Sequence, residues 1–307
     1  MTHRGRAVVR PGEFRLVPGS ESVPIATPQR RAGAARRLRR STPAMMALGF
    51  LVMIHALAVA GPVVLSLDPF STDPLGGLQG TSALHVLGTD ELGRDVLSRL
   101  IYGARVSLLV GLLSMGVAIV TGSIIGALAG YFGGAADAWL MRFTDAMMAL
   151  PTFFLILAVL AVFGGGPVVV MLVIGLTSWM QVARIVRGEV LRWRVAEFVD
   201  AARVIGASDG QILARHIFPQ VAPSIIVTAT LGVAFAILTE SALSYLGLGI
   251  QPPTPSWGNM LQHAQQYLWS APRLAVYPGG MILLTVLSYN FFGDGLRDAL
   301  DPSLRNV

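Results

Sequence analysis

The chain has 307 residues, of which 53 % are hydrophobic and only 13 % are charged, and its mean hydropathy is +0.63. Soluble globular domains carry about twice that share of charged residues, so this composition excludes an ordinary water-soluble fold and predicts an integral membrane protein. All 23 basic residues are arginine, and the formal net charge is +6. The absence of cysteine excludes disulfides, thiolate metal sites and thiol nucleophiles.

The first segment, residues 1–43, is rich in proline, glycine and arginine and has no apolar periodicity. We therefore expect a cytoplasmic tail that is largely disordered. A cleaved signal ending at Ala58–Gly61 is the alternative interpretation. The apolar run over 44–67 is too long for a signal-peptide core, and the preceding tail is too long for its charged region. The pattern favours a retained first membrane span.

Further apolar runs follow, each near the roughly 20 residues that a helix needs to cross the hydrocarbon. With the first run they predict an all-α integral membrane fold with six transmembrane helices in one domain over 44–303. The second run carries Gly111, Gly122, Gly126 and Gly130, a face that indicates close helix packing rather than a ligand site. The expected spans are 44–67, 106–130, 147–164, 168–186, 222–246 and 273–293.

The arginines predict the orientation of these spans. With the amino terminus in the cytoplasm, nineteen of the 23 arginines fall on the inner side and four on the outer side. The positive-inside rule therefore favours a multi-pass protein with both ends in the cytoplasm. Because the arginines follow the topology, the basic balance does not indicate a nucleic-acid partner.

The cytoplasmic loop over 187–221 contains the most informative segment, Asp200–Gly206. Its alanine pair predicts a small-residue face that another surface can approach closely, and Gly206 suits the end of a short helix, where a positive φ is needed. Ser208 or Asp209 can cap a second short helix, and Pro219 is expected to separate that helix from the next apolar run. A membrane protein with such a loop is expected to offer it to a soluble partner.

Two longer segments, 68–105 and 247–272, are expected outside the membrane. In the second, a proline-rich stretch leads to Trp257, which is expected to anchor at the membrane interface. These segments are interpreted either as contacts for an external partner or as structural caps over the helix ends.

Several kinds of chemistry find no support in the sequence. A phosphate-binding loop of the form G-x-x-x-x-G-K-[ST] is absent, as are H-E-x-x-H and G-x-S-x-G, and the five histidines have no metal-site spacing. We therefore predict no catalytic residues, no metal site and no cofactor in this chain, which is not an enzyme by itself.

Four segments together resemble one family. They are the loop 200–219, the stretch His85–Arg105, the stretch Glu240–Gly258 and the end Asn290–Pro302. The chain is similar over about 43–303 to the C-type permease subunit of dipeptide and oligopeptide ABC importers, a type I permease. The coupling motif of that family usually opens with glutamate where this chain has Asp200, and Phe218 and Gln220 stand where leucine and asparagine are commoner.

The resemblance implies a heterodimer with a second permease subunit in the bacterial cytoplasmic membrane. The complete importer would also contain two cytoplasmic ATPases, which bind ATP and magnesium, and an extracytoplasmic solute-binding protein. His216 is interpreted either as a hydrogen-bonding member of the interface or as a helix-end residue. The implied ATPase-coupling residues are Asp200, Ala201, Ala202, Gly206, His216 and Pro219. The implied residues on the binding-protein side are Gly88, Thr89, Asp90, Gly93, Arg94, Asp95 and Trp257.

Glu240 supports a different class. An acidic residue in the fifth span is costly and often functional, so a secondary transporter or channel is an alternative. We expect Glu240 near the external end of its helix, where water and Ser241 satisfy it, and consider it a candidate gate residue. A membrane scaffold without transport is a third class. Within the importer family, peptides, glutathione and nickel all remain open as substrates.

Overall fold

The computed structural model describes residues 28–300, and its regular structure there is helical. The helices run in chain order as α1 (Pro28–Arg40), α2 (Thr42–Val64), α3 (Val96–Phe132), α4 (Gly134–Met148), α5 (Thr152–Phe163), α6 (Pro167–Trp193), α7 (Glu197–Val204), α8 (Asp209–Gln211), the π-helix η1 (Ile212–Ile217), α9 (Phe218–Tyr245), α10 (Trp257–Ala264), the 3-10 helix η2 (Gln265–Tyr267) and α11 (Arg273–Leu300).

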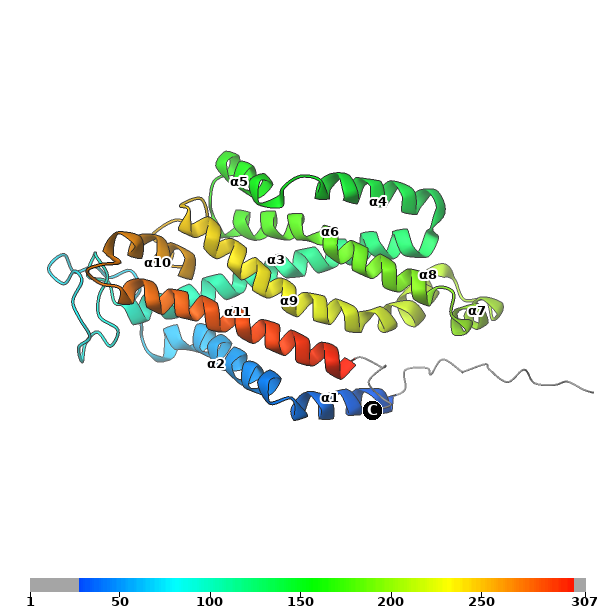
Figure 1. Ribbon diagram of the computed structural model, residues 1–307, viewed down its shortest axis with the longest axis horizontal. Coiled ribbons are helices and arrows are strands. Elements are labelled where there is room, and N and C mark those ends of the chain that lie inside the picture. The colour runs from blue at the N-terminus through cyan, green and yellow to red at the C-terminus, as the bar shows by residue number, and fades with distance from the viewer. Residues whose placement is uncertain (1–27, 301–307) are drawn as a thin grey trace, which may run out of the picture.

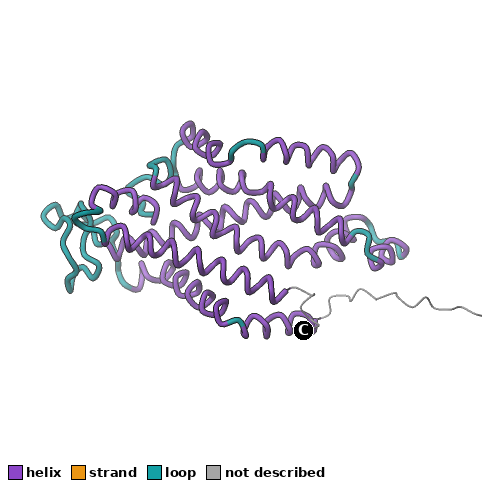
Figure 2. Tube along the Cα trace, in the orientation of Figure 1, coloured by secondary structure: helices purple, strands orange, loops and turns teal. Residues whose placement is uncertain are grey.

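The long helices form an elongated bundle (Figure 1). Helix α3 packs against both α6 and α9, α11 packs against α9 and α2, and α10 covers the junction of α9 and α11. Most loops gather at the two ends of the bundle (Figure 2), with α7 at one end and the 65–95 segment at the other. The expected cytoplasmic loop and the expected external segments therefore lie at opposite ends.

Five helical segments within residues 28–300 are long and apolar enough to cross a membrane: α2, α3, α6, the run Asp209–Tyr245, and α11. The expected third span, a continuous helix over 147–164, is wrong. Helix α5 has 12 residues, which reach about 18 Å and cannot cross alone. It forms a bent pair with α4, at an angle of 78°, and with this pair the bundle has up to six spans.

The break has a local cause. Pro151 disfavours a helical conformation at the residue before it and itself adopts an extended backbone (φ −61°, ψ 106°) at the N-cap of α5. The upstream half of the bent pair contains Asp137, Arg142 and Asp145. These charges lower its hydropathy, which is why no expected span covers residues 131–146.

The expected glycine face is confirmed as a packing surface. A β-carbon on Gly122 would lie 2.6 Å from the Trp179 carbonyl oxygen, and one on Gly126 would collide with the Ala183 carbonyl oxygen. A β-carbon on Gly130 would likewise lie 2.9 Å from the Arg187 carbonyl oxygen. Helices α3 and α6 therefore approach backbone to backbone, because the small residues of α3 leave room for the facing turns.

The helix ends differ from the expected boundaries. The second span begins at Val96 rather than at 106, because Asp95 caps it by accepting a hydrogen bond from the Ser98 N–H at 2.7 Å. The prediction of a largely disordered tail is wrong for Pro28–Arg40, which forms α1. Alanine and arginine favour helix there, and Leu38 lies beside Gly295 of α11. The rest of the predicted tail, residues 1–27, lies outside the described residues.

Candidate functional site

Helix α7 is the short amphipathic helix expected in the cytoplasmic loop. Glu197 and Asp200 lie in its first turn, where the helix dipole favours negative charge. The helix ends at Val204, and Gly206 just beyond it has φ +86° and an N–H that donates to the Arg203 carbonyl at 3.0 Å. The Ala207 N–H then donates to the Ala202 carbonyl at 3.0 Å. The prediction that Gly206 terminates this helix in a left-handed conformation is confirmed.

The two faces of α7 have different roles. Val199 and Ala202 are buried in the main core, with Ala202 only 3 % exposed, whereas Asp200 and Ala201 are exposed. The expectation that Ala201 and Ala202 share one outward surface is therefore wrong. Successive helical residues differ in direction by about 100°, so the alanine pair cannot face a partner together.

The segment after Gly206 begins as expected and then departs from the prediction. Ser208, rather than Asp209, caps the next helix, and it forms a capping box with Gln211. Pro219 does not separate two helices, because the run from Asp209 to Tyr245 is one continuous helical segment. The π-helix η1 precedes Pro219 and accommodates a residue that cannot donate a backbone hydrogen bond.

His216 lies in η1, within the continuous segment and not at a free helix end. Its ring is half-buried and makes no side-chain hydrogen bond with the described part of the chain. A role for His216 in an interface stays a prediction.

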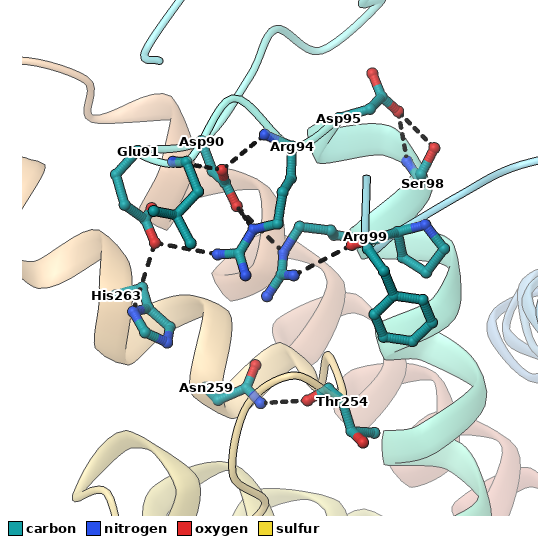
Figure 3. A network of polar contacts seen from close by, with 12 residues as sticks. Asp90, Glu91, Arg94, Asp95, Ser98, Arg99, Thr254, Asn259 and His263 are labelled. Atoms are coloured by element: carbon teal, nitrogen blue, oxygen red, sulfur yellow. Dashed lines mark hydrogen bonds and ion pairs between the residues drawn. The ribbon is translucent and has the colours of Figure 1, made fainter. Parts of the chain in front are cut away.

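The opposite end of the bundle contains a buried network of charges, drawn in Figure 3. Arg94 Nε lies 2.6 Å and Arg99 Nε 3.3 Å from Asp90 Oδ2. Glu91 Oε1 contacts Arg94 Nη2 at 3.1 Å and His263 Nδ1 of α10 at 3.6 Å. The network thus connects the turn before α3 to α3 itself and to α10. Its residues line a cavity of about 20 Å³.

The turn that contributes Asp90 needs glycine at two positions. Gly88 has φ +80° and Gly93 has φ +72°, and a β-carbon at Gly93 would collide with the Asp73 backbone. Thr89 accepts the Gln79 N–H at 2.8 Å and donates to the Gly76 carbonyl at 2.5 Å. The segment is therefore folded, as expected, but Thr89, Asp90 and Arg94 turn inward, so these side chains hold the segment together rather than face a partner.

Trp257 is also turned inward. Its side chain is fully buried, its Nε1–H donates to the Leu100 carbonyl of α3 at 3.1 Å, and its ring lies against Gly103. The expectation of an interface anchor is wrong for Trp257, because α10 folds back against α3 and α9 and covers the indole. The exposed tryptophan at this end is Trp269.

Glu240 is fully buried, whereas the sequence analysis expected it at a helix end open to water. Ser107 Oγ of α3 donates to its Oε2 at 3.1 Å, and Ser244 Oγ donates to its Oε1 at 2.7 Å. The same serine oxygens accept the Trp257 N–H at 3.2 Å and the Ile250 N–H at 2.9 Å. One carboxyl group thus connects α3, α9 and the loop leading to α10.

The sequence reasoning overlooked an apolar patch on α7. Val204 and Ile205, at the helix end, are 86 % and 84 % exposed. Val204 is out of helical phase with the buried positions 199 and 202, so an apolar residue on the exposed face was the available signal; Ile205 follows Ala202 by three positions and is exposed because the helix ends there. Exposed apolar side chains also occur at the other end of the bundle, at Leu75, Leu84, Val86 and Trp269.

Comparison with known proteins identifies the class. Residues 122–306 match the family described as the binding-protein-dependent transport system inner membrane component. A solved structure titled as inward-facing conformations of the MetNI methionine ABC transporter has a TM-score of 0.54 and 18 % sequence identity. It covers 67 % of this chain and 97 % of its own, and it shows a shared fold.

Curated relatives match over nearly the full length. The chain is 38 % identical to the dipeptide transport system permease protein DppC of Alkalihalophilus pseudofirmus, over 94 % of each chain. It is 42 % identical to the di/tripeptide transport system permease protein DppC of Pseudomonas aeruginosa, over 86 % of this chain and 89 % of the relative. It is 40 % identical to the glutathione transport system permease protein GsiD of Pectobacterium atrosepticum, over 88 % and 90 %.

This chain therefore belongs to the family of binding-protein-dependent transport system inner membrane components. It is a multi-pass membrane protein of the ABC importer permease fold, and its curated relatives are transport permease subunits. The relatives favour the importer class over a secondary transporter built around Glu240.

Proposed function

We propose that this chain forms half of the translocation pathway of an ATP-driven importer for short peptides. Its partners are a second permease subunit, two cytoplasmic ATPases that bind ATP and magnesium, and an extracytoplasmic binding protein. Both chain ends lie in the cytoplasm of a bacterial cell. Two curated relatives named as dipeptide or di/tripeptide permeases support a peptide substrate.

The observation that carries the proposal is the exposed surface of α7. Asp200, Ala201, Val204 and Ile205 form a small exposed surface with two large apolar side chains, at the end of the bundle remote from the 65–95 segment (Figure 1). Exposed apolar patches of this kind on a membrane protein's aqueous end mark protein contacts. Val199 and Ala202 pack the opposite face of α7 against the bundle. A partner that binds the exposed face and displaces α7 therefore also moves the helices against which α7 packs.

A single substitution tests the docking surface. Ala201→Arg places a long charged side chain on the outward face and is expected to prevent productive docking of the ATPases. Ala136→Arg is the matched control, because Ala136 is also exposed, on α4, outside the patch. The measurement is ATP-driven uptake of a labelled dipeptide into proteoliposomes that contain the two permeases, the ATPases and the binding protein. Uptake by Ala201→Arg at the wild-type rate contradicts this use of α7.

The same proteoliposomes separate the substrates and the transport classes. Competition by unlabelled dipeptide, longer peptide, glutathione or nickel identifies the transported ligand, and glutathione is the second candidate because of the GsiD relative. A protonophore is expected to leave uptake unchanged while ATP is held constant. Loss of uptake under those conditions contradicts ATP-driven import and supports a proton-coupled transporter.

A further inference from the structure

The last turn of α3 contacts both flanks of α7. On the upstream flank, Arg194 follows the end of α6, and its Nη1 donates to the Gly130 carbonyl at 2.9 Å and to the Tyr131 carbonyl at 3.4 Å. The final carbonyl groups of a helix lack intrahelical partners, so Arg194 supplies hydrogen-bond donors to carbonyl groups at the end of α3. Gly133 has φ +66°, and a β-carbon there would lie 2.8 Å from Arg194 Nη1, so the contact also needs glycine at this position.

On the downstream flank, the Tyr131 hydroxyl donates to Asp209 Oδ1 at 2.6 Å. Asp209 is the first residue of α8, directly after the capping Ser208. The Tyr131 ring is buried in the same core as Val199 and Ala202, the inward face of α7. One turn of α3 thus holds the chain immediately before α7, immediately after it, and beneath it.

This arrangement has a mechanical consequence. Helices α6 and α9 are the covalent continuations of the docking loop. Helix α3 packs closely along α6, and its last turn adds these direct contacts to the loop itself. Helix α3 runs 37 residues to the other end of the bundle, where it carries Arg99 of the buried charge network and Ser107, the donor to Glu240. A displacement of α7 that preserves both flanking contacts must move α3 as well.

We infer that the end of α3 is a third connection between the docking loop and the external end, with Arg194 and Tyr131 as positioning residues. The inference rests on the proposed docking role of α7. It assigns α3 to the moving unit, together with α6 and α9. In this unit the Tyr131–Asp209 hydrogen bond connects α3 directly to the loop, in addition to the packing of α3 on α6, when the ATPases displace α7.

The test uses the reconstituted importer and measures the amount of dipeptide taken up per ATP hydrolysed. Tyr131→Phe and Asp209→Asn each weaken or remove the hydrogen bond with little change in shape. Each is expected to lower this ratio by about fivefold or more, the lower end of ordinary coupling between sites. Because both act through one bond, the double variant is expected to lower the ratio no further than either single variant.

Matched controls separate the contact from the general effect of the substitutions. Tyr245→Phe alters a partly exposed tyrosine of α9, and Asp145→Asn breaks an exposed ion pair with Arg184 that touches neither flank of α7. Both controls are expected to keep the wild-type ratio. Arg194→Ala is expected to lower the ratio, and Arg194→Lys is expected to restore part of it, because lysine still donates to a carbonyl oxygen.

The outcomes distinguish this inference from the proposed function. If the wild-type complex shows no ATP-driven uptake, the proposed function fails, and the inference fails with it. If the wild type transports and Tyr131→Phe and Asp209→Asn keep its ratio, the inference alone is overturned. Additive effects of the two substitutions also overturn it, since they show that the residues act independently.

Hydrogen exchange supplies a second readout that does not depend on transport. In Tyr131→Phe, the amides of Glu197–Val204 are expected to exchange faster, while those of α11 keep their rate. Equal protection of α7 in the variant and the wild type contradicts a holding role for Tyr131.

Discussion

Replacing Glu240 with leucine removes the carboxyl group at which α3, α9 and the loop before α10 meet. In the native protein the carboxyl accepts hydrogen bonds from Ser107 and Ser244, whose oxygens in turn accept the Trp257 and Ile250 amides. Leucine has a similar volume but no acceptor. Two buried hydroxyl hydrogens are then left unpaired, at a cost of about 1–3 kcal/mol each.

The free energy of unfolding is therefore expected to fall by roughly 2–6 kcal/mol in Glu240→Leu. Part of this loss is offset, because leucine removes the cost of burying a carboxyl group. Glu240→Gln is expected to cost only about 1 kcal/mol. Its amide oxygen accepts from one serine, its NH₂ donates to the other, and a serine oxygen has a second lone pair to receive that bond. The difference in unfolding free energy between the two variants therefore reports the contribution of the hydrogen bonds rather than the size of the side chain.

Two assays check this prediction. Thermal unfolding of the purified chain in detergent compares the stability of the variants, and the labelling rate of Thr254→Cys reports whether the external loop loosens. Both assays should separate Glu240→Leu from Glu240→Gln. Glu189→Leu is the control, because it removes a half-buried carboxyl that accepts one serine hydrogen bond far from this loop. A leucine variant with native melting and unchanged loop labelling refutes the reasoning.

Three further predictions follow from the same structure. The purified chain should show no ATP hydrolysis without its partners, because it has no phosphate-binding loop, and turnover by a partner-free preparation contradicts this. Gly126→Val should destabilise the chain by about 1–3 kcal/mol or more, because its side chain meets the Ala183 carbonyl, whereas Gly116→Val, at an open position, should melt like the wild type. In this cysteine-free chain, Gly210→Cys and Trp269→Cys should label from opposite sides of the membrane, and labelling of both from outside intact cells overturns the orientation.

The docking loop shows how far residue chemistry alone reaches. Gly206 could be placed at a helix end because a positive φ is a local property of the backbone, and the structure confirms it. The capping residue remained open between Ser208 and Asp209, because both side chains can accept the same amide hydrogen bonds. The structure has Ser208 as the cap, in a capping box with Gln211, while Asp209 contacts Tyr131, 78 positions earlier in the chain.

The sequence by itself determined the positions of five spans and the close-packed face of α3, because hydrophobic length and glycine spacing act within one segment. Only the tertiary structure decided which side chains are hidden. Trp257 is buried through Leu100 and Gly103, and Glu240 through Ser107, all residues more than one hundred positions away. Composition and periodicity describe a helix and its faces, whereas burial of one side chain depends on which distant segment packs over it.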